Sequence, residues 1–119
     1  MEFMKRLSLI IILVAMVLYL PLNSYAGYYN GNDLVEKMRE WEKANNNIPD
    51  VSWERSGIFV GFIVGVWDST DDDYNPPGRV SVGQLCSIVA KYLKDNPEKW
   101  NLPASTLVRE AFRKAFPKK

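Results

Sequence analysis

The chain has 119 residues with 15 basic and 14 acidic side chains, so its formal net charge at pH 7 is +1. This balance gives no support for generic binding to nucleic acid, which calls for a strongly basic surface. The sequence contains no histidine and a single cysteine. It therefore lacks the commonest general base and the commonest zinc ligand, and no disulfide can form within the chain.

Residues 1–26 predict a secretory signal peptide. Lys5-Arg6 gives a basic start, residues 7–20 form an apolar run broken only by Ser8, and Ser24-Tyr25-Ala26 supplies small residues suited to cleavage. The alternative is a membrane anchor, but a span takes roughly 20 apolar residues and this run is shorter. The absence of a cysteine near the junction argues against a lipoprotein anchor. We therefore expect export, cleavage after Ala26 and no stable membrane insertion afterwards.

Residues 27–119 then form one domain with an uneven distribution of charge. Without the signal peptide, 13 basic and 13 acidic residues remain. Ten acidic and four basic residues lie in 27–73, whereas three acidic and eight basic residues lie in 91–119. An acidic front half and a basic tail favour an oriented encounter with a charged partner. The alternative is two ordinary solvated faces.

Four segments of this domain predict helices and none clearly favours a strand, so we expect a small, compact all-α domain of about four helices. The first helix is expected at 33–44, where one apolar stripe runs along an otherwise charged surface. Asn32 or Asp33 is expected to cap its start, and Asn45-Asn46-Asn47 to end it. The stripe consists of Leu34, Met38 and Trp41.

The second helix is expected at 53–69 and is apolar nearly all round, which is typical of the central helix of a bundle. Gly57, Gly61 and Gly65 recur every four residues and therefore share one helical face. Because glycine inside a helix costs about 1 kcal/mol relative to alanine, we expect a neighbouring helix to pack very close to this face. That neighbour could belong to the same chain or to a second copy in a homodimer. A Val- and Phe-rich strand is the alternative for this segment.

The third helix has the clearest start, because Ser81 and Gln84 form the pattern of a capping box. It is expected to end at Asp95-Asn96-Pro97, and Pro97 to open a short helical turn. The fourth helix is expected to begin at Pro103, which suits a first helical position. The expected inward-facing residues of these two helices are Leu85, Ile88, Val89 and Leu93, then Leu107, Val108, Ala111, Phe112 and Ala115. We interpret Cys86 as a small buried hydrophobe, with a reactive or dimer-bridging thiol as the alternative.

An acidic loop at 68–79, stiffened by Pro76-Pro77, separates the second and third helices. Long exposed loops on a helical scaffold often carry function. An EF-hand reading fails from either Asp68 or Asp71, because neither register places glycine at the sixth position and glutamate at the twelfth. We therefore expect no dedicated metal site.

Catalysis by paired carboxylates would suit an exported cell-wall hydrolase. The spacing singles out no such pair, because Glu36, Glu40 and Glu54 lie in segments with ordinary surface patterns. No glycine loop suited to phosphate is present either. We therefore expect a binding protein without catalytic residues or a cofactor. An exported carboxylate-dependent hydrolase and a general periplasmic accessory or chaperone protein remain the alternatives.

Short motifs follow one another in a distinctive order over nearly all of residues 27–119. They are Gly31-Asn32-Asp33-Leu34, Val60-Gly61-Phe62-Ile63-Val64-Gly65-Val66, Val80-Ser81-Val82-Gly83-Gln84-Leu85, Val89-Ala90-Lys91-Tyr92-Leu93, Asn96-Pro97-Glu98, Leu102-Pro103-Ala104, Glu110-Ala111-Phe112 and Ala115-Phe116-Pro117. In order, spacing and signal peptide, the chain resembles the Rap/Tai-type immunity proteins. These are periplasmic antidotes to peptidoglycan amidase toxins delivered by type VI secretion.

The resemblance implies a helical, often dimeric protein that plugs the active-site cleft of its cognate amidase. Members commonly carry cysteines near the positions of Met38, Phe59 and Asn75, so their disulfides do not carry over to this chain. We expect the acidic loop to enter the cleft of the toxin, with Tyr74 as its anchor. The expected partner-binding residues are Asp68, Asp71, Asp72, Asp73, Tyr74 and Arg79.

Overall fold

The computed structural model describes residues 1–19 and 27–118, so the expected cleavage site at Ser24-Tyr25-Ala26 lies outside the described residues. Within this part the chain is all-helical, which confirms the predicted class, and it contains no strand beyond one isolated bridge between Asn30 and Pro103. The elements are α1 (Glu2–Leu18), α2 (Gly31–Asn45), α3 (Trp53–Thr70), η1 (Asp71–Asp73), α4 (Val82–Asp95), η2 (Pro97–Lys99) and α5 (Ala104–Ala115).

The helix α1 covers both the basic start and most of the apolar run of the expected signal peptide, and none of its residues is buried. Among the described residues, no helix combines the length and the apolar character required to cross a bilayer. Cleavage of residues 1–26 stays a prediction.

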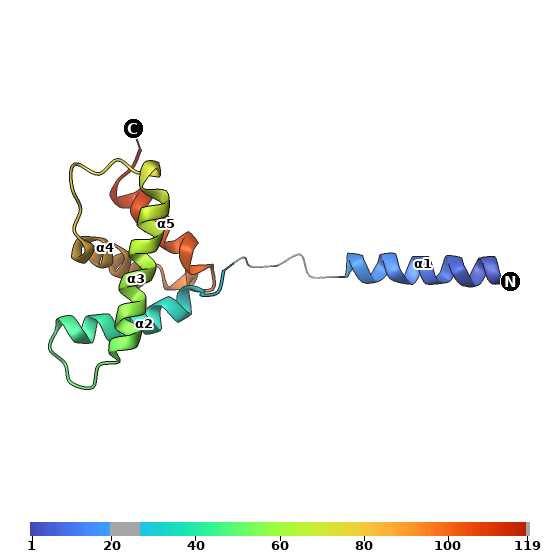
Figure 1. The fold of residues 1–119 in the computed structure, drawn as a ribbon, viewed down its shortest axis with the longest axis horizontal. Helices are drawn as coiled ribbons and strands as arrows, with labels where there is room; N and C mark the ends of the chain where they lie inside the picture. The colour runs from blue at the N-terminus through green and yellow to red at the C-terminus, as the bar shows by residue number, and fades with distance from the viewer. Residues whose placement is uncertain (20–26, 119) are drawn as a thin grey trace.

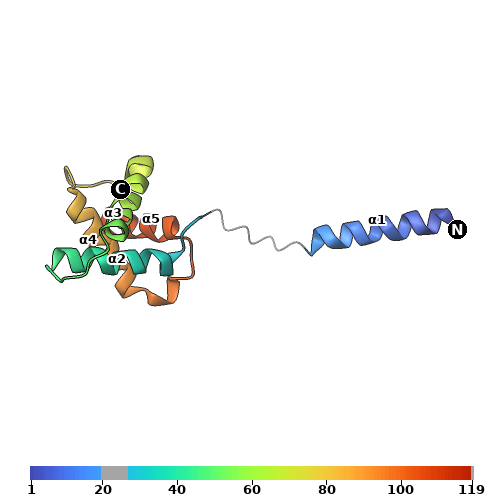
Figure 2. The same ribbon diagram turned by 60° about the horizontal axis from the view of Figure 1, so that its bottom comes forward.

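Helices α2 to α5 enclose one hydrophobic core. The long helix α3 contacts α2, α4 and α5, and α4 packs against α5 (Figure 1; Figure 2 gives a second view). Each large side chain withdrawn from water in this way contributes about 1.5–3 kcal/mol. The largest fully buried side chains are Phe59, Phe112, Leu34, Ile63, Leu93 and Leu107.

The start of α2 is tied to the start of α5 through a close backbone contact. Asn30, rather than the expected Asn32 or Asp33, caps α2, and it exchanges two 3.0 Å hydrogen bonds with Asp33 in a capping box. The amide of Gly31 donates to the Leu102 carbonyl at 2.9 Å. A Cβ at Gly31 would lie 2.6 Å from Trp100 Cα, so only glycine fits this junction without a shift of the backbone.

The three glycines of α3 behave differently from the expectation. This helix buries Ser56, Phe59 and Ile63, whereas Gly57, Gly61 and Gly65 lie on its exposed side. A Cβ added at any of the three would meet nothing within 4 Å. The prediction of a closely packed helix of the same chain against this face was therefore wrong. The alternative of a strand is also excluded, since the segment is α-helical.

The predicted start of α4 is confirmed, since Ser81 and Gln84 form a capping box with hydrogen bonds of 2.8 and 3.2 Å. The helix α5 begins at Ala104, one residue after Pro103, and Ala115 in its last turn is exposed rather than inward-facing. Cys86 is fully buried, and burial raises the pKa of its thiol to about 11. A thiol in this state is protonated and unreactive at neutral pH, which agrees with the interpretation as a buried hydrophobe.

A polar cluster closes the side of the core between α4, η2 and α5. The Tyr92 hydroxyl donates to Glu110 Oε2 at 2.5 Å and accepts from Lys99 Nζ at 3.3 Å, while Lys99 and Glu110 form an ion pair at 3.6 Å. Burial, together with the neighbouring Glu110, raises the pKa of Tyr92, so its hydroxyl stays protonated and continues to donate. The cluster thus joins three elements by satisfied polar groups, and we assign it a structural role.

Candidate functional site

The acidic loop begins as a direct continuation of α3. Asp68 lies in the last turn of the helix, and Asp71–Asp73 form the single turn of η1. All four carboxylates are exposed, and none forms an ion pair within the described residues. We call Asp68, Asp71, Asp72 and Asp73 the acidic end of α3.

The position of the acidic end concentrates negative charge. The C-terminus of a helix carries the equivalent of about −0.5 charge, so acidic side chains there are unfavourable by roughly 0.3–1 kcal/mol each at an exposed site. The cation recorded next to this end is Lys118, and its Nζ donates to the Asp72 carbonyl at 3.4 Å rather than to a carboxylate. The acidic end therefore concentrates negative charge that no ion pair among the described residues offsets.

Tyr74 holds this end in place from inside the core. Its side chain is only 5% exposed and stacks on Trp67 with ring centroids 5.5 Å apart, and it meets Phe112 edge-on at 5.4 Å. The Tyr74 hydroxyl lies 2.8 Å from Thr70 Oγ1, which bonds to the Val66 carbonyl. The expectation that Tyr74 enters the cleft of a partner does not fit this burial. Its ring instead connects the loop to the core.

Beyond Tyr74 the loop leaves the core and borders a groove. The Asn75 amide donates to the Phe116 carbonyl at 3.2 Å, and the chain then passes over residues 76–81 to the start of α4. Arg79 is exposed and lines the groove, whose volume is about 710 Å³. Its main apolar lining residues are the half-buried Trp41, Val80, Ile88 and Phe116.

Of the six residues expected to bind a partner, the structure thus brings four together at the acidic end. Arg79 lies on the groove, and Tyr74 lies between the two in the core. Sequence reasoning missed the groove, because α2, α4 and the segment after α5 form it jointly. Trp41 belongs to the predicted apolar stripe of α2, yet it is only half-buried and lines the groove.

Two of the three carboxylates considered for a hydrolase have structural partners, and the third, Glu54, is exposed. Glu40 accepts from the Ser52 amide at 2.8 Å and from Lys43 Nζ at 2.9 Å, and these two hydrogen bonds lower its pKa. A general acid needs a raised pKa instead. Glu36 pairs with Arg55 at 3.1 Å. In the described part of the chain no three acidic or thiol side chains are placed to share a metal ion.

Comparison with known proteins gives a result for the same part of the chain. No curated protein matches it. The model of the family described as Rap1a immunity proteins matches residues 30–117, which run from the cap of α2 to the segment just after α5. This match covers most of the 119 residues, including the acidic end and the groove, and it confirms the resemblance seen in the sequence. The chain belongs to the Rap1a immunity proteins.

Proposed function

We propose that the protein is a periplasmic immunity protein that binds a peptidoglycan amidase toxin delivered by type VI secretion and blocks its active-site cleft. Family membership supports an immunity role. The observation that carries the binding mode is the acidic end, where four exposed carboxylates lie without ion pairs among the described residues. Such a cluster attracts a basic or polar rim around a cleft and accelerates encounter with it.

The fixed position of the acidic end favours tight binding. The stacking of Tyr74 on Trp67 and its contact with Thr70 hold the loop before the partner arrives. A surface that is already ordered loses less conformational entropy on association. The protein therefore inhibits by occupying the cleft with a rigid acidic projection and catalyses no reaction itself.

Export follows from the first 26 residues, whose basic start and apolar run match a signal peptide. The expected product begins at Gly27, three residues before the family match. Mass spectrometry of the protein recovered from the periplasm tests this part. A cytoplasmic product that retains residues 1–26 would contradict it.

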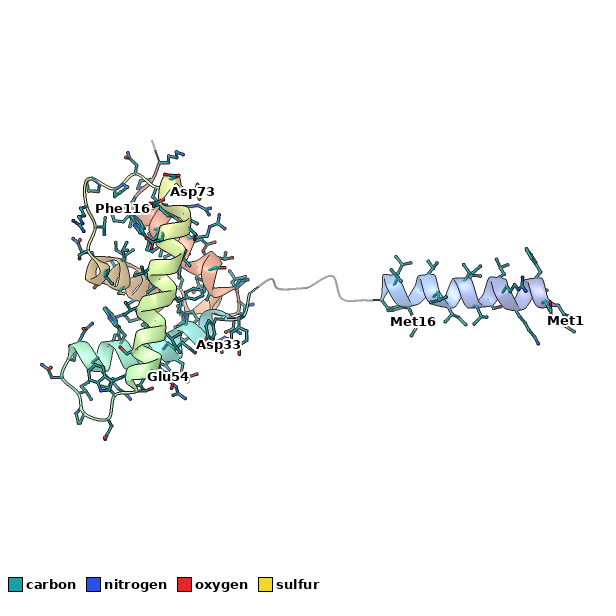
Figure 3. All side chains as sticks on the ribbon, viewed as in Figure 1. Met1, Met16, Asp33, Glu54, Asp73 and Phe116 are labelled. Carbon is teal, nitrogen blue, oxygen red and sulfur yellow. The ribbon has the colours of Figure 1, made fainter. Side chains whose placement is uncertain are left out.

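The binding mode is tested by removing charge without changing shape. The triple variant Asp71→Asn, Asp72→Asn and Asp73→Asn should weaken binding to the cognate amidase about tenfold or more. Its melting temperature should not fall, because the lost charges are unfavourable at a helix C-terminus. Glu54→Gln is the control, because Glu54 is exposed in the first turn of the same helix, at its opposite end (Figure 3). Isothermal titration calorimetry measures both. Equal affinity of the triple variant and the wild type would remove the acidic end from the interface.

We also propose a homodimer in which the exposed glycine face of α3 meets a second copy. Gly57, Gly61 and Gly65 have open space in place of a side chain, so the backbone of another helix could approach closely there. Sedimentation equilibrium should show a dimer that Gly61→Leu dissociates. Gly83→Leu is the control, because Gly83 is also helical and free of neighbours within 4 Å. A wild-type monomer at all concentrations would exclude this assembly.

A further inference from the structure

The groove offers an apolar floor that no other segment of the described residues fills. It lies between the end of α2, the 77–81 loop and the first two turns of α4. Added Cβ atoms at Gly78 and Gly83 would meet nothing within 4 Å, so these walls are open. Its volume of about 710 Å³ leaves room for a large side chain.

The groove lies near the end of α3 that carries the acidic residues, because Phe116 contacts both regions. Phe116 lines the groove and packs edge-on against Trp67 with ring centroids 5.9 Å apart, and its carbonyl accepts from Asn75. Trp67 directly precedes the first carboxylate of the acidic end. Figure 3 shows Phe116 beside Asp73 at the end of α3 opposite Glu54. Phe116 thus connects the floor of the groove to the aromatic cluster beneath the acidic end.

The charges around the groove indicate which kind of partner segment would bind there. Four carboxylates without ion pairs in the described chain favour Lys or Arg on the side of the acidic end. Arg79 lines the groove itself, so basic side chains are repelled from that part and directed toward the aspartates. The half-buried aromatic floor of Trp41 and Phe116 favours a large apolar side chain, of the kind that anchors protein interfaces.

We infer that the groove receives a large apolar side chain from a basic segment of the toxin, whose Lys or Arg residues meet the acidic end. The inference rests on the proposed immunity function and adds a second contact to it. In this arrangement the toxin inserts a side chain into the immunity protein, while the acidic end enters the toxin. Each of the two proteins thus inserts a group into the other, and recognition depends on both contacts.

A peptide titration tests the chemistry of the groove without a toxin. Blocked peptides containing Lys-Trp-Lys, Lys-Ala-Lys or Glu-Trp-Glu are added to the purified protein while amide resonances are followed by NMR. Only Lys-Trp-Lys should shift both groove amides, such as those of Gln84 and Ser87, and the amides of Asp71–Asp73. An equal response to Lys-Ala-Lys or Glu-Trp-Glu would overturn the inference. Concentration-dependent shifts of the groove amides of Gln84 and Ser87 without peptide would identify a second copy as the occupant, which would also overturn the inference.

A steric variant tests the groove with the amidase. Ser87→Phe fills the groove from an exposed helical position and should weaken binding about tenfold or more. Thr106→Phe is the matched control, since Thr106 is an exposed hydroxyl residue of α5 outside the groove. If the amidase binds the wild type and Ser87→Phe equally well, the groove is not used although the immunity function stands. If the amidase does not bind the wild type at all, the proposed function fails, and the peptide titration still decides what the groove accepts.

Discussion

Two regions of the molecule use glycine in opposite ways. At the start of α2, Gly31 lies against Trp100 and Leu107, and a Cβ would come within 2.6 Å of both residues. On the outer side of α3, Gly57, Gly61 and Gly65 have nothing within 4 Å. Regular spacing made the α3 glycines conspicuous in the sequence, yet the glycine that close packing requires within this chain is the isolated one. Spacing along a helix shows which residues share a face, and it does not show what covers that face.

The largest expected effect comes from closing the space at Gly31. Gly31→Ala forces Cβ against the Cα of Trp100, which is backbone and cannot rotate away, although the tip of Leu107 can. We expect a loss of about 2–3 kcal/mol in the free energy of unfolding, as for other overpacked sites. Urea unfolding followed by circular dichroism measures it. A stability within 0.5 kcal/mol of the wild type, roughly the range of neutral surface changes, would show that the junction is loose.

A smaller effect is expected from the cap beside this glycine. Asn30→Ala removes the acceptor for the Asp33 amide and should cost about 1 kcal/mol. Asn45→Ala is the control, since Asn45 is an exposed residue at the other end of the same helix. In thermal unfolding, Asn30→Ala should have a lower melting temperature than Asn45→Ala. Equal melting temperatures would argue that Asn32 or Asp33 takes over the capping role.

The smallest expected effect has the opposite sign. Gly61→Ala adds a methyl group to an exposed helical position with open space around it, so it should stabilise the monomer by about 0.5–1 kcal/mol. Urea unfolding at low protein concentration measures this gain. In the proposed homodimer the same methyl group would separate the two α3 helices. Gly61→Ala should then stabilise the monomer while it weakens the dimer, and a loss of stability at low concentration would contradict the open face.

The features that were predicted well from the sequence are determined by residues close together in the chain. The start of α4 was found because Ser81 and Gln84 satisfy one another three residues apart, whatever surrounds them. The cap of α2 was misplaced because Asn30, Asn32 and Asp33 are all suitable capping residues. The contact of Gly31 with Trp100, nearly 70 residues later in the chain, accompanies the choice of Asn30. Local signals suffice where one residue is suited to the role, and tertiary contacts decide between several.

The candidate site shows the same division. The acidic residues could be recognised from the sequence alone, because a run of aspartates is visible without knowledge of the fold. Tyr74 was expected at the surface as an aromatic anchor, but its burial depends on Trp67 and Phe112, which come from two different helices. The groove required α2, α4 and the segment after α5 to meet. Its apolar lining looked like ordinary core in each helix taken alone.

The burial of Tyr74 separates two tasks that one loop performs. The ring attaches the segment to the scaffold, whereas the carboxylates of the aspartates before it form no ion pair within the described residues. Mutations among these aspartates are therefore free to accumulate without unfolding the molecule. If the acidic end binds the toxin as proposed, lineages that share this architecture could exchange one antagonist for another by altering a few exterior acids, without a new scaffold.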